Sequence, residues 1–373
     1  MSISSGISPT TMVGLGSLAV TGTVTAMLDV RTHTDGGQSA EAVSERIVSW
    51  LGEARRTLDL ALYDVRLPGA VGDHVADAIR HAAARGVSVR IAFNQDERPP
   101  DAGDRPFFPA PPRTEPHVLE TLGVPVKPIP GWRDLMHHKY VVRDGEALWT
   151  GSMNWTLDGF TRQENVLATL DSPGVAAAYT RNFEQLWDNV SVSDSGDFDT
   201  APVDGVRPWF CPGRGPELSH RIAKRIGAAR RRVRIATPLL TAGPILGTLA
   251  EVVEERRVDV AGVCDATQVE QVFRQWAANP RSRWKGPLLE RCLVAFHGKH
   301  SVPYAPGSLH DFMHAKTTIA DDTVFLGSFN LSRSGEMNAE NVLEISDAAL
   351  ADRLAGFVDE LRERYPALDR RAQ

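Results

Sequence analysis

Two segments of the chain carry the same set of reactive side chains at the same spacing. In the first segment His137 and Lys139 are two residues apart, Asp144 follows, and Gly-Ser-Met-Asn comes at 151–154. The second segment consists of His314, Lys316, Asp321 and Gly-Ser-Phe-Asn at 327–330. Each segment is followed by a Glu-Asn pair, which comprises Glu164 and Asn165 in the first copy and Glu340 and Asn341 in the second.

These residue types are suited to reaction at a phosphodiester. Its anionic oxygens repel nucleophiles, so an enzyme must neutralise them, supply an attacking group and protonate the departing alkoxide. A neutral imidazole can attack phosphorus, a second protonated imidazole can act as general acid, and a pKa of about 6.5 makes both forms accessible. Lysine and asparagine side chains can hold the non-bridging oxygens without a metal. The duplicated set therefore predicts a phosphodiester-transferring enzyme.

Each motif requires a strand and a turn to position it. The apolar and β-branched residues around each histidine predict a strand that ends in a turn at Asp144 or Asp321. Side chains alternate along a strand, so a histidine and a lysine two residues apart share one face. Returning strands are predicted at 148–150 and 324–326, and they bring the Gly-Ser-x-Asn segments to the same surface.

The duplication continues outside the motifs. Residues 51–58 align with 226–233, an offset of 175, and the two lead histidines are 177 residues apart. Nearly the same offset therefore aligns most of the first half with the second half. This is the pattern of two similar lobes, not of a short repeat. Periodicity predicts alternating helices and strands, namely 42–56, 58–65, 71–85 and 87–93 in the first half and 222–231, 233–237, 245–255 and 258–263 in the second. This alternation indicates an α/β fold, with a largely parallel or mixed sheet flanked by helices in each lobe.

Composition suggests boundaries between these parts. We predict an N-terminal extension at 1–40, a first lobe at 41–190, a polar linker at 191–208 and a second lobe at 209–373. Residues 96–116, rich in Pro, Asp and Arg, predict a loop beside the site. His297, Lys299 and His300 are interpreted as a loop that lines the approach to the site, not as a metal cluster.

Bulk properties narrow the class of protein. The net charge of −6 argues mildly against a general nucleic-acid coat. The three scattered cysteines form no C-x-x-C pair, which predicts free thiols and no zinc site. Residues 10–28 have no Lys or Arg before them, and no segment reaches about 18 uninterrupted apolar residues. We therefore expect a cytoplasmic protein without an integral membrane segment.

The duplicated H-x-K-x4-D motif, with G-S-x-N behind each copy, resembles the signature of the phospholipase D superfamily over about residues 40–365. This resemblance implies a phospholipase D-like fold, in which two α/β lobes are related by a pseudo-twofold axis. It also implies one active site where the motifs meet. The expected reaction passes through a covalent phosphohistidine, followed by transfer to water or an alcohol, with no cofactor and no metal.

The resemblance also suggests a role for each motif residue. It implies that His137 is the nucleophile and His314 the general acid, later the base that activates water, although the near-symmetry of the motifs leaves this order open. The residues expected to contact the phosphate are Lys139, Lys316, Asn154 and Asn330. Supporting roles fall to Ser152 and Ser328, which add hydrogen bonds, to Asp144 and Asp321, which hold the turns, and to Glu164 and Glu340, which could each accept an imidazole N–H.

Three functions remain open at this level. The first is hydrolysis or transfer of a phosphodiester, most simply a phospholipid. The second is a nuclease that uses the same residues on DNA or RNA, and the third is a non-catalytic phosphate-binding scaffold. The sequence does not define the headgroup, the acceptor or the oligomeric state.

Overall fold

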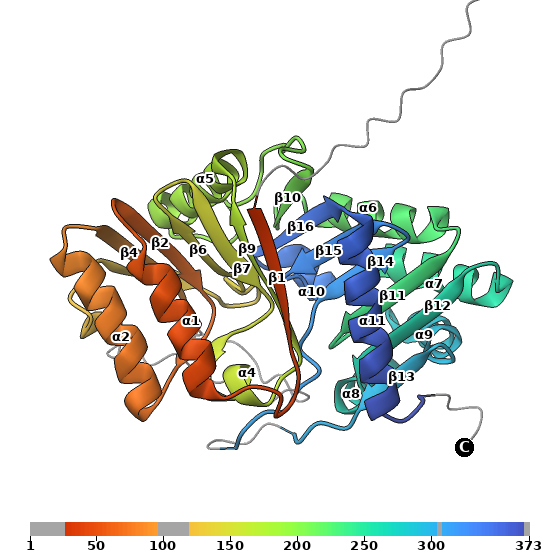
Figure 1. The fold of residues 1–373 in the computed structure, drawn as a ribbon. Helices are drawn as coiled ribbons and strands as arrows, with labels where there is room; N and C mark the ends of the chain where they lie inside the picture. Colours follow the sequence, from red (N-terminus) through yellow and green to blue (C-terminus); the bar gives the residue numbers. More distant parts are fainter. Residues whose placement is uncertain (1–26, 96–118, 304–307, 369–373) are drawn as a thin grey trace, which may run out of the picture.

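Each half of the chain forms a seven-stranded mixed sheet in the computed structural model, which describes residues 27–95, 119–303 and 308–368 (Figure 1). The first sheet has the order β1-β9-β7-β6-β2-β4-β5, and the second has the equivalent order β10-β16-β15-β14-β11-β12-β13. In both sheets the last three strands are parallel and the other neighbours are antiparallel. The predicted α/β fold of two similar lobes is confirmed.

The strands alternate with helices along the chain. The first sheet contains β1 (Met27–His33), β2 (Thr57–Leu62), β4 (Ser88–Gln95), β5 (Val126–Pro130), β6 (Lys139–Arg143), β7 (Ala147–Gly151) and β9 (Asn165–Asp171). The second contains β10 (Val206–Cys211), β11 (Arg232–Thr237), β12 (Asp259–Asp265), β13 (Phe296–Lys299), β14 (Thr317–Ala320), β15 (Thr323–Gly327) and β16 (Glu340–Ser346). A small parallel pair joins β3 (Val65–Arg66) and β8 (Trp155–Thr156).

The helices of the first lobe are α1 (Ala40–Gly52), α2 (Gly69–Ala84), α4 (Leu157–Thr161) and α5 (Pro173–Asn189). Those of the second are α6 (Gly215–Ala228), α7 (Gly243–Glu255), α8 (Ala266–Ala278), the 3₁₀ helix η1 (Arg283–Lys285), α9 (Gly286–Leu293), α10 (Arg333–Met337) and α11 (Ala348–Arg364). The long helices α5 and α11 begin at equivalent places, where Ser172 and Asp347 accept backbone N–H groups of the first turn.

Three apolar layers alternate with the two sheets. One layer lies between the first sheet and helices α1 and α2, and another lies between the second sheet and α6, α7 and α9 (Figure 1). The third layer contains α5 and α11 together with strand residues of both lobes, such as Tyr140, Phe210, Leu326 and Ile345. Because this layer is continuous across the lobes, it holds the motif-bearing ends of the two sheets in one rigid unit.

Two edge strands lie where the sequence predicted other segments. Residues 27–33, assigned to the extension at 1–40, form β1 and pair with β9 along its whole length. Strand β10 begins at Val206, inside the linker predicted at 191–208. The side chains of β1 are mostly exposed or half-buried, so this strand has no apolar run by which its sequence could reveal it. The predicted loop at 96–116 lies outside the described residues.

The aspartate of each motif anchors its turn. Asp144 and Asp321 have left-handed φ angles of 58° and 52°, a conformation that aspartate tolerates better than most residues. The carboxylate of Asp144 accepts the backbone N–H groups of residues 55–57, with its shortest bonds to each at 3.0, 2.6 and 2.9 Å. Asp321 accepts those of residues 230–232 at 2.9, 2.8 and 3.1 Å. Each aspartate thus joins a motif hairpin to the connection between the first helix and strand of its lobe.

This arrangement predicts a structural effect for Asp321→Ala. Three backbone donors lose their acceptor, so we expect the free energy of unfolding at neutral pH to fall by about 3 kcal/mol. Burial opposes ionisation of Asp321, but the three N–H groups lower its pKa below 3.8, so its contribution is present above that pH and is lost as the pH falls through the lowered pKa. Urea unfolding measures the change. Asp322→Ala is the matched control, because its exposed ion pair with Arg231 is worth at most about 1 kcal/mol. Equal losses in both variants would contradict the anchoring role.

Candidate active site at the junction of the lobes

The two motifs meet because each lobe inserts its motif segment beside the Glu-Asn segment of the other. Met136, just before the first motif, forms a parallel bridge with Ala339, and Met313, just before the second, forms one with Glu164. The backbone N–H of His137 donates to the Ala339 carbonyl at 2.9 Å. These crossings explain why β6 and β14 begin only after the histidines, which were predicted to lie within the strands.

His137 is oriented by a carboxylate from the opposite lobe. Its Nδ1 lies 2.8 and 2.9 Å from the two carboxylate oxygens of Glu340. A carboxylate only accepts hydrogen bonds, so Nδ1 carries the proton and Nε2 keeps its lone pair. Glu340 is completely buried and is itself fixed by the Asn338 amide at 3.3 Å. This pair makes Nε2 of His137 a positioned nucleophile.

His314 is oriented by an amide instead. Its Nδ1 lies 3.1 Å from Oδ1 of Asn165. The Asn165 amide nitrogen donates to the carbonyls of Gly159 and Gln163, which fixes the oxygen toward His314. Nδ1 of His314 therefore donates its proton to Asn165, and Nε2 is again the free ring nitrogen.

The expected partner of His314, Glu164, is used elsewhere. No hydrogen bond or ion pair joins these two side chains in the described part of the chain. Glu164 instead accepts from Lys299, a residue whose sequence surroundings predicted a loop at the approach to the site. The register of the two bridges supplies the reason. In one bridge Met136 pairs with Ala339, whose counterpart in the first lobe is Gln163. In the other bridge Met313 pairs with Glu164, one residue further along. A shift by one residue exchanges the side chains that face a partner.

The two motif lysines have equivalent positions. Lys139 Nζ donates to the His137 carbonyl at 2.6 Å, and Lys316 Nζ donates to the His314 carbonyl at 2.8 Å. Both side chains are almost fully buried. An ammonium has three donors, so two on each lysine remain after these bonds.

Asn154 and Asn330 present amide oxygens that accept no hydrogen bond from the described residues. Both Oδ1 atoms are buried without a partner there. Buried polar groups are normally paired, so two unpaired amide oxygens at equivalent positions mark a polar site whose hydrogen bonds the described residues do not complete. The N–H groups of the same amides suit the oxygens of a phosphate.

The serines and glycines of the Gly-Ser-x-Asn segments position the site from behind. Ser152 Oγ donates to Asn165 Oδ1 at 2.7 Å, and Ser328 Oγ accepts the backbone N–H of Asn341 at 3.0 Å. Gly151 and Gly327 pack directly on the opposite strand, where an added Cβ would lie 2.3 and 2.1 Å from a backbone oxygen. The serines, which the sequence suggested as further hydrogen-bonding groups, therefore hold the Glu-Asn segments.

Burial and the two lysines determine the electrostatics of the site. Burial, followed by the charges of the motif lysines, holds the pKa of both His137 and His314 well below 6.5. Burial lowers the pKa of Lys139 to about 7 and that of Lys316 well below its usual value. Burial also raises the pKa of Glu340, although the charge of Lys139 counteracts it. A buried site with this excess of donors is suited to an anion, whose charge would stabilise the protonated lysines and imidazole.

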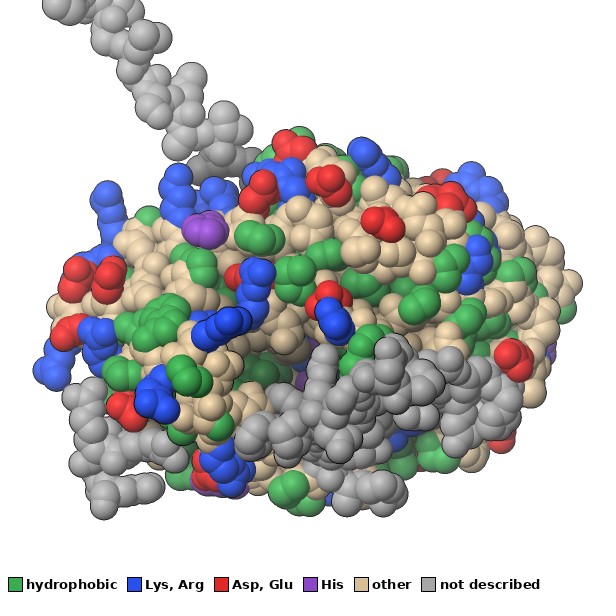
Figure 2. Space-filling model, turned by 180° about the vertical axis from the view of Figure 1, so that it is seen from behind, with side chains coloured by type: hydrophobic (Ala, Val, Ile, Leu, Met, Phe, Trp, Pro, Cys, Tyr) green, Lys and Arg blue, Asp and Glu red, His purple; other side chains and the backbone are tan. Residues whose placement is uncertain are grey.

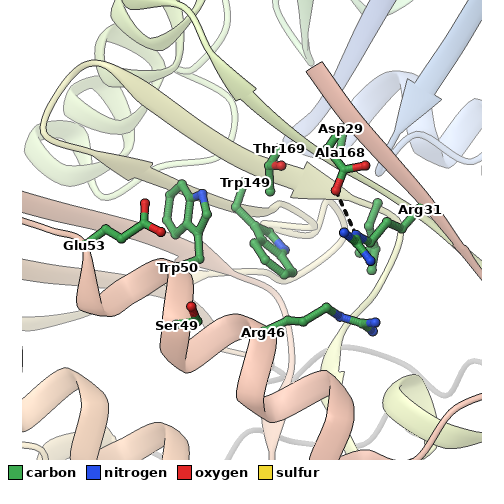
Figure 3. Close-up of a pocket in the computed structure, with 10 residues that line it drawn as sticks. Asp29, Arg31, Arg46, Ser49, Trp50, Glu53, Trp149, Ala168 and Thr169 are labelled. Atoms are coloured by element: carbon green, nitrogen blue, oxygen red, sulfur yellow. Dashed lines mark hydrogen bonds and ion pairs between the residues drawn. The ribbon is translucent and has the colours of Figure 1, made fainter. Parts of the chain in front are cut away.

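Other surface features lie apart from this junction. A cavity of about 200 Å³ between α1 and strands β1, β7 and β9 is lined by Arg31, Arg46, Trp50 and Trp149 and contains none of the motif residues (Figure 3). On the face in Figure 2, outside the grey atoms, Lys and Arg side chains are mixed with Asp and Glu. That face shows no continuous basic stripe of the kind that follows a nucleic-acid backbone.

Metal-binding clusters and membrane-spanning helices are both absent from residues 27–95, 119–303 and 308–368. These ranges contain no group of three or more His, Cys, Asp or Glu side chains placed to hold a metal ion. Within the same residues, no helix combines the length and the apolar character needed to cross a bilayer. The cysteines Cys211, Cys264 and Cys292 are buried and free.

Comparison with known proteins identifies the family. The family model described as cardiolipin synthase, PLD-like domain, matches twice, at residues 47–187 and 222–362. The chain therefore belongs to this family and contains two phospholipase D-like repeats, which confirms the resemblance seen in the sequence.

Particular relatives share different parts of the chain. The mitochondrial cardiolipin hydrolase of Chlamydomonas reinhardtii is 27% identical over 158 residues, which are 42% of this chain and 63% of that protein. Cardiolipin synthase A of Cronobacter sakazakii is 24% identical over 359 residues, covering 89% of this chain and 70% of that protein. The crystal structure of phosphatidylserine synthase from Haemophilus influenzae Rd KW20 matches 91% of this chain and 87% of its own, with a TM-score of 0.62 and 13% identity. This last likeness shows the fold.

Proposed function

We propose that this protein is a phosphodiesterase of the phospholipase D type that transfers a phosphatidyl group to water or to an alcohol. The observation that carries this proposal is the pair of buried imidazoles at the lobe junction, each with Nδ1 held by a side chain of the opposite lobe. One imidazole can then attack phosphorus while the other protonates the leaving group. The lysines and asparagines supply donors for the non-bridging oxygens.

The first half of the reaction forms a covalent intermediate. Nε2 of neutral His137 attacks phosphorus, the P–O bond to the headgroup breaks, and the leaving oxygen takes the proton from Nε2 of protonated His314. The phosphorylated imidazole is cationic while Nδ1 keeps its proton, and the Glu340 carboxylate stabilises it. Lys139, Lys316, Asn154 and Asn330 hold the phosphate oxygens as charge develops.

The second half releases the phosphatidyl group. His314, now neutral, takes a proton from water or an alcohol, whose oxygen attacks phosphorus and breaks the P–N bond to His137. Water gives phosphatidic acid and an alcohol gives a new phosphodiester. Both histidines return to their starting protonation states, so the cycle needs no cofactor.

A phospholipid is the proposed substrate class. The relatives are named for reactions of cardiolipin or phosphatidylserine, which are phospholipids. The mixed charge of the face in Figure 2 gives nucleic acid no comparable support. The cytoplasmic location expected from the sequence stays a prediction.

The lowered pKa of Lys139 predicts a pH dependence. Below a pH of about 7 this lysine is protonated and attracts the diester, and above it the charge is lost. We expect kcat/KM to fall as the pH rises through this value. The bound anion keeps Lys139 protonated to higher pH, so the alkaline limb of kcat should instead follow the loss of the His314 proton. Initial rates at low and saturating substrate measure both profiles. A kcat/KM that stays constant through neutral and mildly alkaline pH would contradict this assignment.

A parallel turnover assay in EDTA tests the proposed function. Phosphatidylcholine vesicles, cardiolipin vesicles, bis-p-nitrophenyl phosphate and single-stranded DNA are offered separately. We expect release from a phospholipid that His137→Ala abolishes and that His220→Ala, at an exposed histidine of α6, leaves unchanged. Cleavage of DNA alone would replace the proposal with a nuclease. No turnover of any substrate would favour a phosphate-binding scaffold.

A further inference from the structure

Lys299, on edge strand β13 of the second lobe, is buried among acceptors of the first lobe. Its Nζ lies 3.0 and 3.2 Å from the two oxygens of Glu164 and 3.2 Å from Asp35 Oδ2. It also donates to the Arg162 carbonyl at 3.1 Å. Only 3% of Lys299 is exposed and Glu164 is completely buried, so this ion pair is shielded from solvent.

Glu164 is satisfied without the help of His314. The Tyr365 hydroxyl, at the end of α11, donates to its Oε1, and the backbone N–H of Asp35 approaches the same oxygen at 3.4 Å. The carboxylate thus has partners for both oxygens. Asn165, the next residue, is left to accept from His314.

Strand register shows what occupies the position of Lys299 in the first lobe. Asn94 on β4 pairs with Ile129 on β5, and Asp265 on β12 pairs with Lys299 on β13. Asn94 and Asp265 are equivalent, because each accepts the backbone N–H of the methionine that precedes a motif histidine. Ile129 is therefore the counterpart of Lys299.

This difference acts together with the one-residue shift in bridge register to make the surroundings of the two histidines unequal. A lysine at the Lys299 position binds Glu164, whereas the buried isoleucine at the Ile129 position offers Glu340 no cation. Glu340 accordingly contacts its histidine, and Glu164 does not. One half of the site has a carboxylate behind the imidazole, and the other half has a neutral amide.

We propose that Lys299 is a positioning residue that withdraws Glu164 from His314 and thereby assigns different roles to the two histidines. Resting on the proposed function, this inference makes His137, with its carboxylate, the nucleophile whose cationic phosphorylated form is stabilised. His314, with a neutral amide, holds its proton less tightly and is the better acid for the leaving group.

The other charges around His314 do not remove this asymmetry. Lys316 lies on its own segment, Lys139 and His137 face it from the first lobe, and His310 lies in the segment that precedes it. All four disfavour the protonated imidazole. Glu164, next in the chain to the Asn165 that binds His314, is a carboxylate that could oppose them, and Lys299 neutralises it.

Four proteins test the inference by histidine-selective ¹⁵N NMR titration of His314 and by the alkaline limb of kcat against pH. They are the wild type, Lys299→Met, Glu164→Gln and the double variant. Lys299→Met removes the cation that neutralises Glu164, so the pKa of His314 and the alkaline limb of kcat should each rise by about one unit. Glu164→Gln removes one carboxylate from Lys299, which keeps Asp35, and should lower both values. The double variant, with neither charge, should return close to the wild type.

Conservative variants separate this role from a clamp between the lobes. Lys299→Arg retains the charge and should keep the wild-type pKa of His314. Tyr365→Phe leaves the ion pair intact and removes one donor from Glu164. It should therefore raise the pKa of His314, as Lys299→Met does, and it serves as the test if Lys299→Met does not fold.

An unchanged His314 pKa in Tyr365→Phe and in the folded single variants, with reduced thermal stability alone, would overturn the inference. The NMR titration needs no turnover. If the protein were inactive on every diester, the proposed function would be refuted. The NMR titration of His314 would still decide whether Lys299 sets the pKa of that histidine.

Discussion

Replacement of His137 by asparagine is expected to abolish turnover, with kcat reduced at least about 10⁴-fold. The amide cannot form the bond to phosphorus that Nε2 of the imidazole forms, and it leaves the buried Glu340 carboxylate without its N–H donor. Steady-state hydrolysis of a phospholipid and of bis-p-nitrophenyl phosphate measures the loss. Both substrates should be affected equally, because the same nucleophile serves both.

The control for this variant is His220→Asn, which makes the same replacement at an exposed histidine of α6 and should retain wild-type rates. Urea unfolding of both variants establishes that the fold persists. A folded His137→Asn protein with more than about one hundredth of the wild-type kcat would show that the lobe junction does not use this imidazole covalently.

Replacement of His314 by asparagine is expected to separate the two halves of the reaction. p-Nitrophenolate leaves without protonation, so attack by His137 on bis-p-nitrophenyl phosphate should still proceed. Water then lacks its general base, and phosphoenzyme breakdown should slow by about 10² to 10⁴-fold. Rapid-mixing absorbance should show a burst of one p-nitrophenolate per enzyme, and mass spectrometry should locate the adduct on His137. With a phospholipid, whose alkoxide needs a proton, the first step should also be slow.

The reverse pattern would exchange the roles of the two histidines. If His137→Asn gave the burst and the adduct lay on His314, the second motif would carry the nucleophile. The carboxylate behind His137 and the amide behind His314 favour His137 as the nucleophile and His314 as the acid.

The duplicated motifs made the fold and the composition of the site predictable. Residue spacing alone placed a histidine, a lysine, a serine and an asparagine in each half, and the helix and strand periods placed most elements between them. Asp144 and Asp321 could be interpreted as turn anchors because an Asp after a strand is a local signal. Local patterns of this kind need no knowledge of the other lobe.

The partners of the histidines could not be predicted, because they depend on contacts across the lobes. Sequence symmetry suggested that Glu164 and Glu340 act alike, but a one-residue difference in bridge register and a buried lysine direct Glu164 elsewhere. Lys299 lies in a short strand whose sequence resembles a polar loop. Only the strand pairing identifies Ile129 as its counterpart in the first lobe and so shows that the two lobes differ at this position. Likewise, β1 is defined by its pairing with β9 rather than by its own sequence.

The stereochemical course at phosphorus tests the covalent mechanism most directly. A phosphorothioate diester of known configuration is transferred to methanol by the wild-type enzyme, and ³¹P NMR gives the configuration of the product. Attack by His137 followed by attack of the alcohol inverts phosphorus twice, so overall retention is expected. Overall inversion would mean a single direct displacement and would contradict a covalent intermediate at the lobe junction.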